Sequence, residues 1–442
     1  MTDARALDRR ILALAVPALG ALVAEPLFLL ADTAMVGHLG AAPLAGLGVA
    51  STILQAAVGL CVFLAYTTTP RVARRLGAGD EPGAVRAGIE GMWLGIAVGL
   101  ALAIAGLLSA DALPRLLASD PEVLRLATVY LAASCWGLPA MLLVIAAAGL
   151  LRGLQDTRTP LVVAGAGFLA NAVLNAILIY GLGLGVLGSA LGTVIAQWGM
   201  AAVYVAIAVR AARRTGASLA PGVGGVRRAL PDSSLMLLRN VTIRAVLIAV
   251  VGVGSLAGVA ELAALQVLLT AFSLLAFALD ALAIAGQSMI GHDLGAGRLD
   301  AVRAATRRLV MWGLVSGAAC GALGLALAWV AGRVFTSDPA VLELLPIGFA
   351  ALAVSGPLAG YVFVLDGILI GAGDVRYLAL AGLIPMAASL VAYGIVAALG
   401  LHGLTSVAAI WLVFGLVFLG GRALVLGLRA RQDVWMRAGE AG

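Results

Sequence analysis

Long apolar runs separated by short polar segments make up most of this chain. Twelve runs approach or exceed the ~20 residues that an α-helix needs to cross a bilayer. We expect membrane-spanning helices at residues 11–37, 45–69, 84–108, 122–148, 159–182, 187–210, 234–254, 258–289, 302–330, 341–369, 377–399 and 404–427. The pattern therefore predicts an all-α integral membrane protein with twelve transmembrane helices.

The positions of the basic residues support this count. The chain contains no lysine, so its 28 basic residues are all arginine. If the N-terminus is cytoplasmic, 23 arginines fall in the inner segments and only three in the outer ones. Positive charge concentrates on the cytoplasmic side of membrane proteins. We therefore expect a multi-pass protein of the bacterial inner membrane with both termini in the cytoplasm.

Composition adds two exclusions. The chain is 62% hydrophobic and 11% charged, with a mean hydropathy of +1.09. A soluble domain of 442 residues could not bury that much apolar surface, so we expect the lipid bilayer as its solvent. The net charge of +6 follows from the topology and calls for no nucleic-acid partner.

The two halves of the sequence repeat each other at a shift of 218 residues. Leu-Gly-Ala-Gly at 76–79 recurs at 294–297, and Ser-Asp-Pro at 119–121 recurs at 337–339. With six spans each, both halves enter the membrane from the same side, as in parallel-repeat transporters. We expect two six-helix bundles related by a pseudo-two-fold axis along the membrane normal. Their predicted bounds are 1–210 and 232–442, joined by a cytoplasmic linker at 211–231.

Polar residues inside the spans carry the candidate chemistry, because an ionisable group in lipid is costly. The sharpest case is Asp32, in the outer part of the first helix. Depth along the spans predicts that it converges with Asn171, Asn175, Thr193 and Tyr130 in the first bundle. A carboxylate with amide and hydroxyl oxygens can take a proton or hold a hard cation such as Na⁺. A purely interhelical hydrogen-bonding role for the two asparagines stays open.

The second half lacks this set of residues. At the 218 shift, the counterparts of Asp32, Asn171, Asn175 and Thr193 are Val250, Ser389, Tyr393 and Trp411. Neither a carboxylate nor an amide is retained among these four positions. We therefore expect the coupling chemistry in the first half.

Other ionisable residues have substrate-binding or structural interpretations. Glu25 shares a helix face with Asp32, since seven residues make nearly two turns. Arg244 and Asp280 lie at similar depths, which predicts an ion pair that holds two helices together. Asp366 lies near the inner end of its span and either faces a cavity or snorkels to the interface.

Several of these segments resemble one transporter family. Residues 28–40, Phe-Leu-Leu-Ala-Asp-Thr-Ala-Met-Val-Gly-His-Leu-Gly, resemble the first-helix motif of the multidrug and toxic compound extrusion (MATE) family, and within it the DNA-damage-inducible protein F type. The two Leu-Gly-Ala-Gly repeats fit this family. The stretches 280–283 and 366–374 fit it as well, and the resemblance covers nearly the whole chain.

The resemblance implies antiport of small organic, often cationic, compounds against H⁺ or Na⁺. It implies that Asp32 is the coupling residue and that Asn171 and Asn175 line the same cation site. Some members have Asp where this chain has Asn175, so the missing charge weakens the case for sodium and favours protons. Beyond the coupling ion we expect no cofactor, and we expect a monomer.

Two other functions compete with antiport. A flippase for lipid-linked precursors is the alternative, but it would require a strongly cationic cavity, and only Arg239 and Arg244 lie within spans. An intramembrane enzyme would need a nucleophile set or a metal motif. The sequence contains neither pattern, and its three histidines are not clustered.

Overall fold

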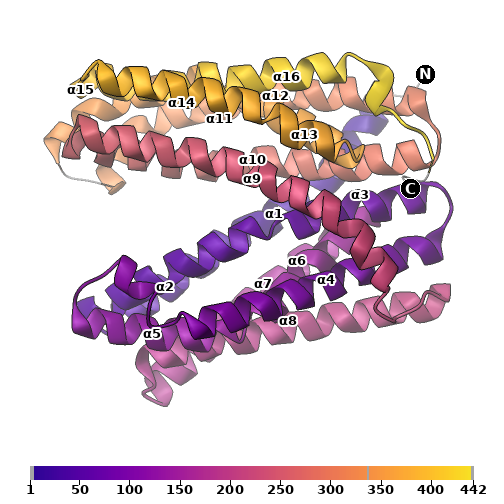
Figure 1. Cartoon of the computed structure of the whole chain (residues 1–442), viewed down its shortest axis with the longest axis horizontal. Helices are drawn as coiled ribbons and strands as arrows, with labels where there is room; N and C mark the ends of the chain where they lie inside the picture. Colours follow the sequence, from indigo (N-terminus) through magenta and orange to yellow (C-terminus); the bar gives the residue numbers. More distant parts are fainter. Residues whose placement is uncertain (1–3, 336–337, 440–442) are drawn as a thin grey trace. The chain divides into compact units, whose positions relative to one another are not determined.

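A computed structural model describes residues 4–335 and 338–439, apart from the side chains of residues 25, 223–230, 329 and 331–335. All regular elements in this part of the chain are helices (Figure 1). Those of the first half are α1 (Ala4–Gly37), α2 (Ala41–Leu60), α3 (Phe63–Gly77), α4 (Glu81–Leu108), the 3₁₀ turn η1 (Pro114–Leu116), α5 (Pro121–Cys135), α6 (Leu138–Gly153), α7 (Arg158–Asn175), the π-helix η2 (Ala176–Gly181) and α8 (Gly185–Thr215).

The second half also consists of helical segments. It contains α9 (Val223–Ala257), α10 (Val259–Gly295), α11 (Leu299–Phe335), α12 (Pro339–Gly371), α13 (Val375–Ala381), α14 (Leu383–Ala398), α15 (Gly403–Leu412), the π-helix η3 (Val413–Leu419), α16 (Gly420–Ala430) and the 3₁₀ turn η4 (Asp433–Trp435).

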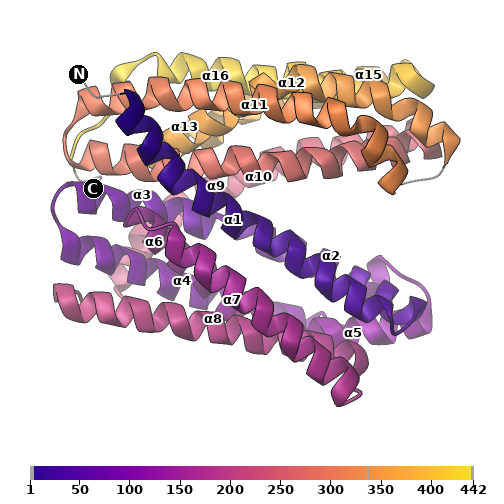
Figure 2. The same ribbon diagram turned by 180° about the vertical axis from the view of Figure 1, so that it is seen from behind.

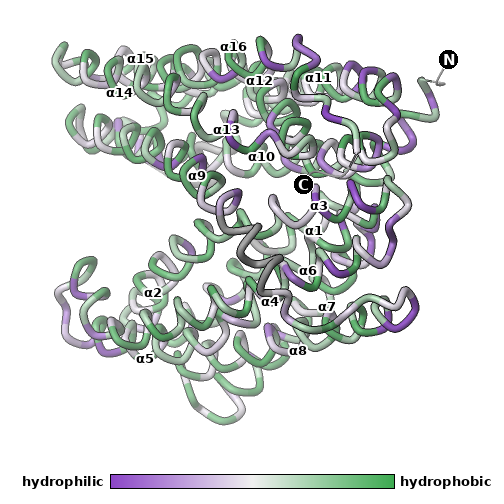
Figure 3. Tube along the Cα trace, turned by 45° about the vertical axis from the view of Figure 1, so that its right-hand side comes forward, coloured by the Kyte–Doolittle hydropathy of each residue, from purple (hydrophilic) through white to green (hydrophobic). Residues whose placement is uncertain are grey.

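The predicted number of spans is confirmed. In the described chain, eleven helices are long and apolar enough to cross a membrane, and the bent pair α5 and α6 makes up to twelve. That pair bends by 51° between Cys135 and Leu138, inside the single span expected at residues 122–148. Hydrophobic colour follows the length of the helices, whereas hydrophilic colour gathers at their ends (Figure 3).

Contacts divide the chain into two compact units, and the division departs from the expected one at the N-terminus. One unit is Gly20–Ser233, and the other combines Met1–Leu19 with Ser234–Gly442. The first turns of α1 join the second bundle because Arg10 pairs with Asp293 of α10 and Asp8 pairs with Arg308 of α11. The expected linker is mostly helical, since α8 runs to Thr215 and α9 begins at Val223.

Close helix packing explains much of the glycine content. In the second bundle α12 packs against α10 and α11 (Figure 1). A Cβ on Gly313 or Gly317 of α11 would lie 2.6 or 2.2 Å from a backbone oxygen of α12. In the first bundle α4 packs against α6, and Gly95 and Gly99 make the corresponding close approaches. Small residues let backbones approach where lipid supplies no hydrophobic driving force between helices.

The repeated sequence motifs are helix boundaries. Asp120 caps α5 by accepting from the backbone N–H groups of Glu122 and Val123, and Asp338 caps α12 by accepting from that of Ala340. Each Ser-Asp-Pro motif is thus an N-cap followed by a proline at the first helical position. The second glycine of each Leu-Gly-Ala-Gly motif has a positive φ, which suits a residue without a Cβ.

Candidate ion-coupling site

The carboxylate of Asp32 lies inside the first bundle with only 1% of the residue exposed. Three neutral side chains donate hydrogen bonds to it. The Asn175 amide nitrogen lies 2.9 Å from Oδ1, the Tyr130 hydroxyl lies 3.2 Å from Oδ2, and the Ser189 hydroxyl donates to Oδ1. These donors come from α7, α5 and α8 respectively. Asp32 therefore joins α1 to three other helices.

Asn171 and Thr193 form a second set of hydrogen bonds, which holds the Asn175 side chain in place. The Asn171 amide nitrogen donates to the Thr193 hydroxyl at 3.1 Å and to the Asn175 amide oxygen at 3.5 Å. The Asn175 nitrogen also donates to the Asn171 amide oxygen at 3.3 Å. Asn171, Asn175 and Thr193 are all buried. The network is thus a continuous chain from Thr193 through the two asparagines to Asp32.

Local structure explains why these groups meet. Asn171 and Asn175 are four residues apart on α7, so they share one face. Gly192 of α8 faces this pair, and a Cβ there would lie 2.1 Å from the Asn175 amide oxygen. A Cβ on Gly188 would lie 2.8 Å from the backbone of Leu178. Gly192 lets α8 approach α7 closely, and Gly188 lets it approach η2; the packing of α7 and α8 can be followed in Figure 2.

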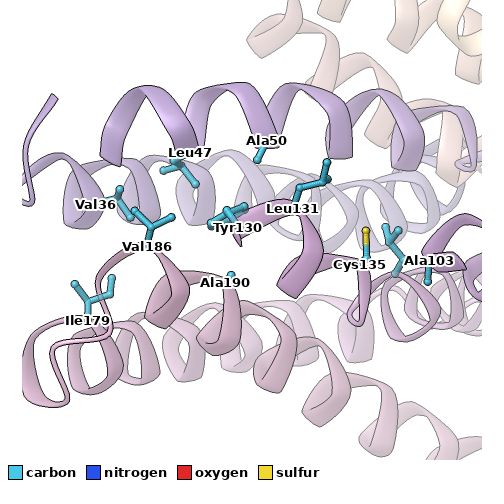
Figure 4. Close-up of a cluster of buried hydrophobic side chains, with 11 residues drawn as sticks. Val36, Leu47, Ala50, Ala103, Tyr130, Leu131, Cys135, Ile179, Val186 and Ala190 are labelled. Atoms are coloured by element: carbon cyan, nitrogen blue, oxygen red, sulfur yellow. The ribbon is translucent and has the colours of Figure 1, made fainter. Parts of the chain in front are cut away.

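Apolar side chains surround the hydroxyl end of the network. Tyr130 belongs to a buried cluster with Val36, Leu47, Val186 and Ala190 (Figure 4). Such surroundings lower the local dielectric, which strengthens each hydrogen bond to the carboxylate and raises the cost of leaving it unpaired. The described contacts of Asp32 include no basic side chain. This combination is typical of a site that exchanges an ion.

The structure brings together the five residues predicted for this site: Asp32, Tyr130, Asn171, Asn175 and Thr193. Their role in ion coupling stays a prediction. Sequence reasoning missed Ser189, whose signal was its position one turn before Thr193 on the same helix face. The side chain of Glu25 lies outside the described residues.

The other predicted polar residues form a different arrangement. Buried Asp366 of α12 pairs with Arg239 of α9 and, at 2.8 Å, with Arg422 of α16. Asp366 thus ties three helices of the second bundle together. Arg244 is exposed, and its pairing with Asp280 stays a prediction.

Among the described residues, no group of three or more His, Cys, Asp or Glu side chains is placed to hold a metal ion. The candidate site instead offers one carboxylate, two amides and three hydroxyls. A duplicated all-helical membrane protein with an isolated, hydrogen-bonded acid in one bundle has the construction of a secondary transporter.

Comparison with known proteins gives the same class and identifies the family. The MatE family model matches residues 17–177 and 236–395. Protein DETOXIFICATION 44, chloroplastic, of Arabidopsis thaliana is 31% identical over 383 residues, covering 84% of this chain and 73% of that protein. DNA damage-inducible protein F of Escherichia coli (strain K12) is 28% identical over 310 residues, covering 68% of each.

A solved structure of similar fold is the Vibrio cholerae MATE transporter VcmN in its bent form. It has a TM-score of 0.86 and 20% identity, and the match covers 99% of this chain and 98% of that one. At this identity the likeness shows the fold alone. The chain belongs to the MatE family and is a multi-pass membrane transporter of the multidrug and toxic compound extrusion type. The resemblance read from residues 28–40 is confirmed.

Proposed function

We propose that this protein exports small amphipathic compounds, many of them organic cations, by antiport against H⁺ or Na⁺, with Asp32 as the coupling residue. The observation that supports this proposal is a carboxylate in the membrane interior held by three neutral donors. A buried acid is costly to maintain, and an exchangeable ion gives it a function. A relative from Edwardsiella ictaluri, 30% identical over 352 residues, is named Multidrug resistance protein MdtK.

Antiport fits the duplicated construction. Two similar bundles can alternate access by moving against each other around a substrate. The coupling ion is needed in only one bundle, provided that its release changes the preferred state of the whole molecule. We propose a monomer in the bacterial inner membrane, with both termini in the cytoplasm and no cofactor beyond the coupling ion.

The test is efflux of a fluorescent organic cation from proteoliposomes under an imposed proton or sodium gradient. Asp32→Asn keeps the size of the side chain and most of its hydrogen bonds but removes the exchangeable charge. We expect gradient-driven efflux to fall by at least about 10-fold, equivalent to about 1.4 kcal/mol. Asp111→Asn, at an exposed position after α4, is the matched control and should transport like the wild type.

Either of two results would contradict the proposal. One is coupled efflux that survives in Asp32→Asn. The other is a chain that moves the probe under neither gradient, which would direct attention to lipid-linked substrates.

A further inference from the structure

One arginine of the second bundle lies on an exposed face in the middle of a span. Arg244 is the central residue of the 27-residue apolar segment Pro231–Ala257 of α9. At a rise of ~1.5 Å per residue, it lies about 20 Å from both ends of that segment. Its side chain is exposed, and among the described residues it makes no hydrogen bond or ion pair. Snorkelling serves long side chains near helix ends, so it does not provide for this one.

The rest of that face is apolar. Leu237, Val241, Ile248 and Val251 are 37–70% exposed. They are spaced three, four or seven residues from Arg244, so all five share one side of α9. A guanidinium in such surroundings is costly where it faces lipid, and charged residues at this depth face water or a polar partner instead.

Arg239 shows how the same helix accommodates a structural arginine. It is 8% exposed, pairs with Asp366 and donates to the Asn240 side chain at 3.0 Å. Arg244 has no such arrangement among the described residues. At the 218 shift its counterpart is Pro26, so the first half has no charge at this position. Neither packing nor the shared plan of the two halves accounts for Arg244, and an ionisable residue of this kind indicates a function.

We propose that Arg244 binds the anionic group of transported amphipathic compounds, so that the substrates include carboxylates or sulfonates as well as organic cations. This inference rests on the proposed export function. A guanidinium stays charged and presents a planar fork of N–H donors, which suits the paired oxygens of such a group. Val241 and Ile248, about one turn away on either side, offer apolar surface to the rest of the molecule. A charge flanked by apolar side chains is complementary to an amphipathic anion.

Direct binding tests the inference independently of transport. The probe is 2-naphthalenesulfonate, and its neutral analogue 2-naphthalenesulfonamide is the matched ligand. Binding to the purified protein in phosphatidylcholine nanodiscs is measured by isothermal titration calorimetry. We expect Arg244→Gln to weaken sulfonate binding by at least about 10-fold, equivalent to about 1.4 kcal/mol, and to leave sulfonamide binding unchanged. Arg244→Lys keeps the charge but not the fork, so its loss should be smaller.

The matched control is Arg307→Gln, at an exposed position near the start of α11, which should bind the sulfonate like the wild type. An equal loss in this control would overturn the inference, as would a wild type that does not prefer the sulfonate to the sulfonamide. Nanodiscs of phosphatidylglycerol distinguish a second source of the same chemistry. Sulfonate binding should persist in them, and its loss would assign Arg244 to lipid phosphates and overturn the inference.

Thermal unfolding separates substrate binding from a structural ion pair with Asp280. Because Arg244 is exposed, Arg244→Gln should leave the thermal midpoint unchanged. A marked fall would overturn the inference, and recovery on adding Asp280→Asn would identify the ion pair as the reason.

Transport separates this inference from the proposed function. Loss of coupled efflux in Asp32→Asn tests the coupling residue, whereas the Arg244 variants test only the charge of the substrate. Sulfonate binding that is unchanged in Arg244→Gln would contradict the inference and leave antiport standing.

Discussion

The two halves of this protein share a backbone plan but not a buried chemistry. Positions that hold Asp32, Asn171, Asn175 and Thr193 in the first half hold Val250, Ser389, Tyr393 and Trp411 in the second, and all eight are buried. In the second half Ser389 donates to the Pro385 carbonyl, and Tyr393 donates to the Ile410 carbonyl at 3.4 Å. Trp411 packs against Phe272 and Phe414 at ring-centroid distances of 6.2 and 5.4 Å.

The two halves share close helix contacts at glycines, helix caps and left-handed glycines. The close approaches of Gly95 and Gly99 to α6 recur, at the 218 shift, as those of Gly313 and Gly317 to α12. Helix caps and left-handed glycines recur as well. The difference teaches that the two halves can share backbone geometry while differing in buried acids, because burying a charge is costly unless nearby groups stabilise it.

One ion pair is retained with its polarity reversed. Across the first Leu-Gly-Ala-Gly turn, Arg75 pairs with Asp80 at 3.6 Å, and both side chains are about one-third exposed. Across the second turn, Asp293 pairs with Arg298 at 2.6 Å. The reversed charge lets Asp293 also bind Arg10 of α1 at 3.0 Å, which anchors the N-terminus to the second bundle.

The largest effect should come from placing the acid of the first half in the second. Val250→Asp buries a carboxyl group at a position without the donors that surround Asp32, and such a group costs several kcal/mol. We expect a large loss of folded protein, measured by size-exclusion chromatography and thermal unfolding in detergent. Val250→Thr is the milder control. A stable Val250→Asp protein would show that the second half can still accommodate an acid, and would break the comparison.

A loss of stability of intermediate size should distinguish the Asp293–Arg298 pair from the Arg75–Asp80 pair. Asp293→Asn weakens charge-assisted hydrogen bonds on a residue that is 1% exposed, so we expect a loss of about 1–3 kcal/mol in unfolding free energy. Asp80→Asn removes a pair that is partly exposed to solvent and should cost about 0–1 kcal/mol. Asparagine still caps α4 through Gly83, so the control isolates the charge. Equal losses in both variants would refute the difference between the two turns.

The smallest effect should come from the helix caps. Removal of a capping side chain typically costs about 1 kcal/mol. Asp120→Ala should lose the hydrogen bonds that its carboxylate accepts from Glu122 and Val123, and Asp338→Ala should lose at least the one from Ala340. Thermal unfolding of both variants beside the wild type measures the difference. Restoration by Asp→Ser at each position would confirm that the cap is responsible, whereas a loss that serine does not restore would argue against it.

Much of the site could be predicted because charge in a membrane is rare. Asp32 stood out in an apolar span, and span direction matched its depth to that of Asn171, Asn175, Thr193 and Tyr130. Ser189 could not be recognised in this way, since a serine in a transmembrane helix most often bonds to its own backbone. Its role depends on the rotation of α8 and on the close approach allowed by Gly192.

The ion pairs show the same limit. Arg239 and Arg244 lie five residues apart, which rotates them about 140° around α9. Depth along the spans predicted a pair between Arg244 and Asp280, which stays a prediction, and it gave no partner for Arg239. The structure buries Arg239 against Asp366 and leaves Arg244 exposed.

The sequence by itself determined the number of spans, the duplication and the half that carries Asp32. These properties depend on hydropathy, charge and repetition along the chain. Only the tertiary structure decided which side chains touch Asp32, which arginine pairs with Asp366, and that the first turns of α1 belong with the second bundle. The physical reason is that a span facing lipid on one side and protein on the other is apolar all round, so its sequence does not show which face is turned inward.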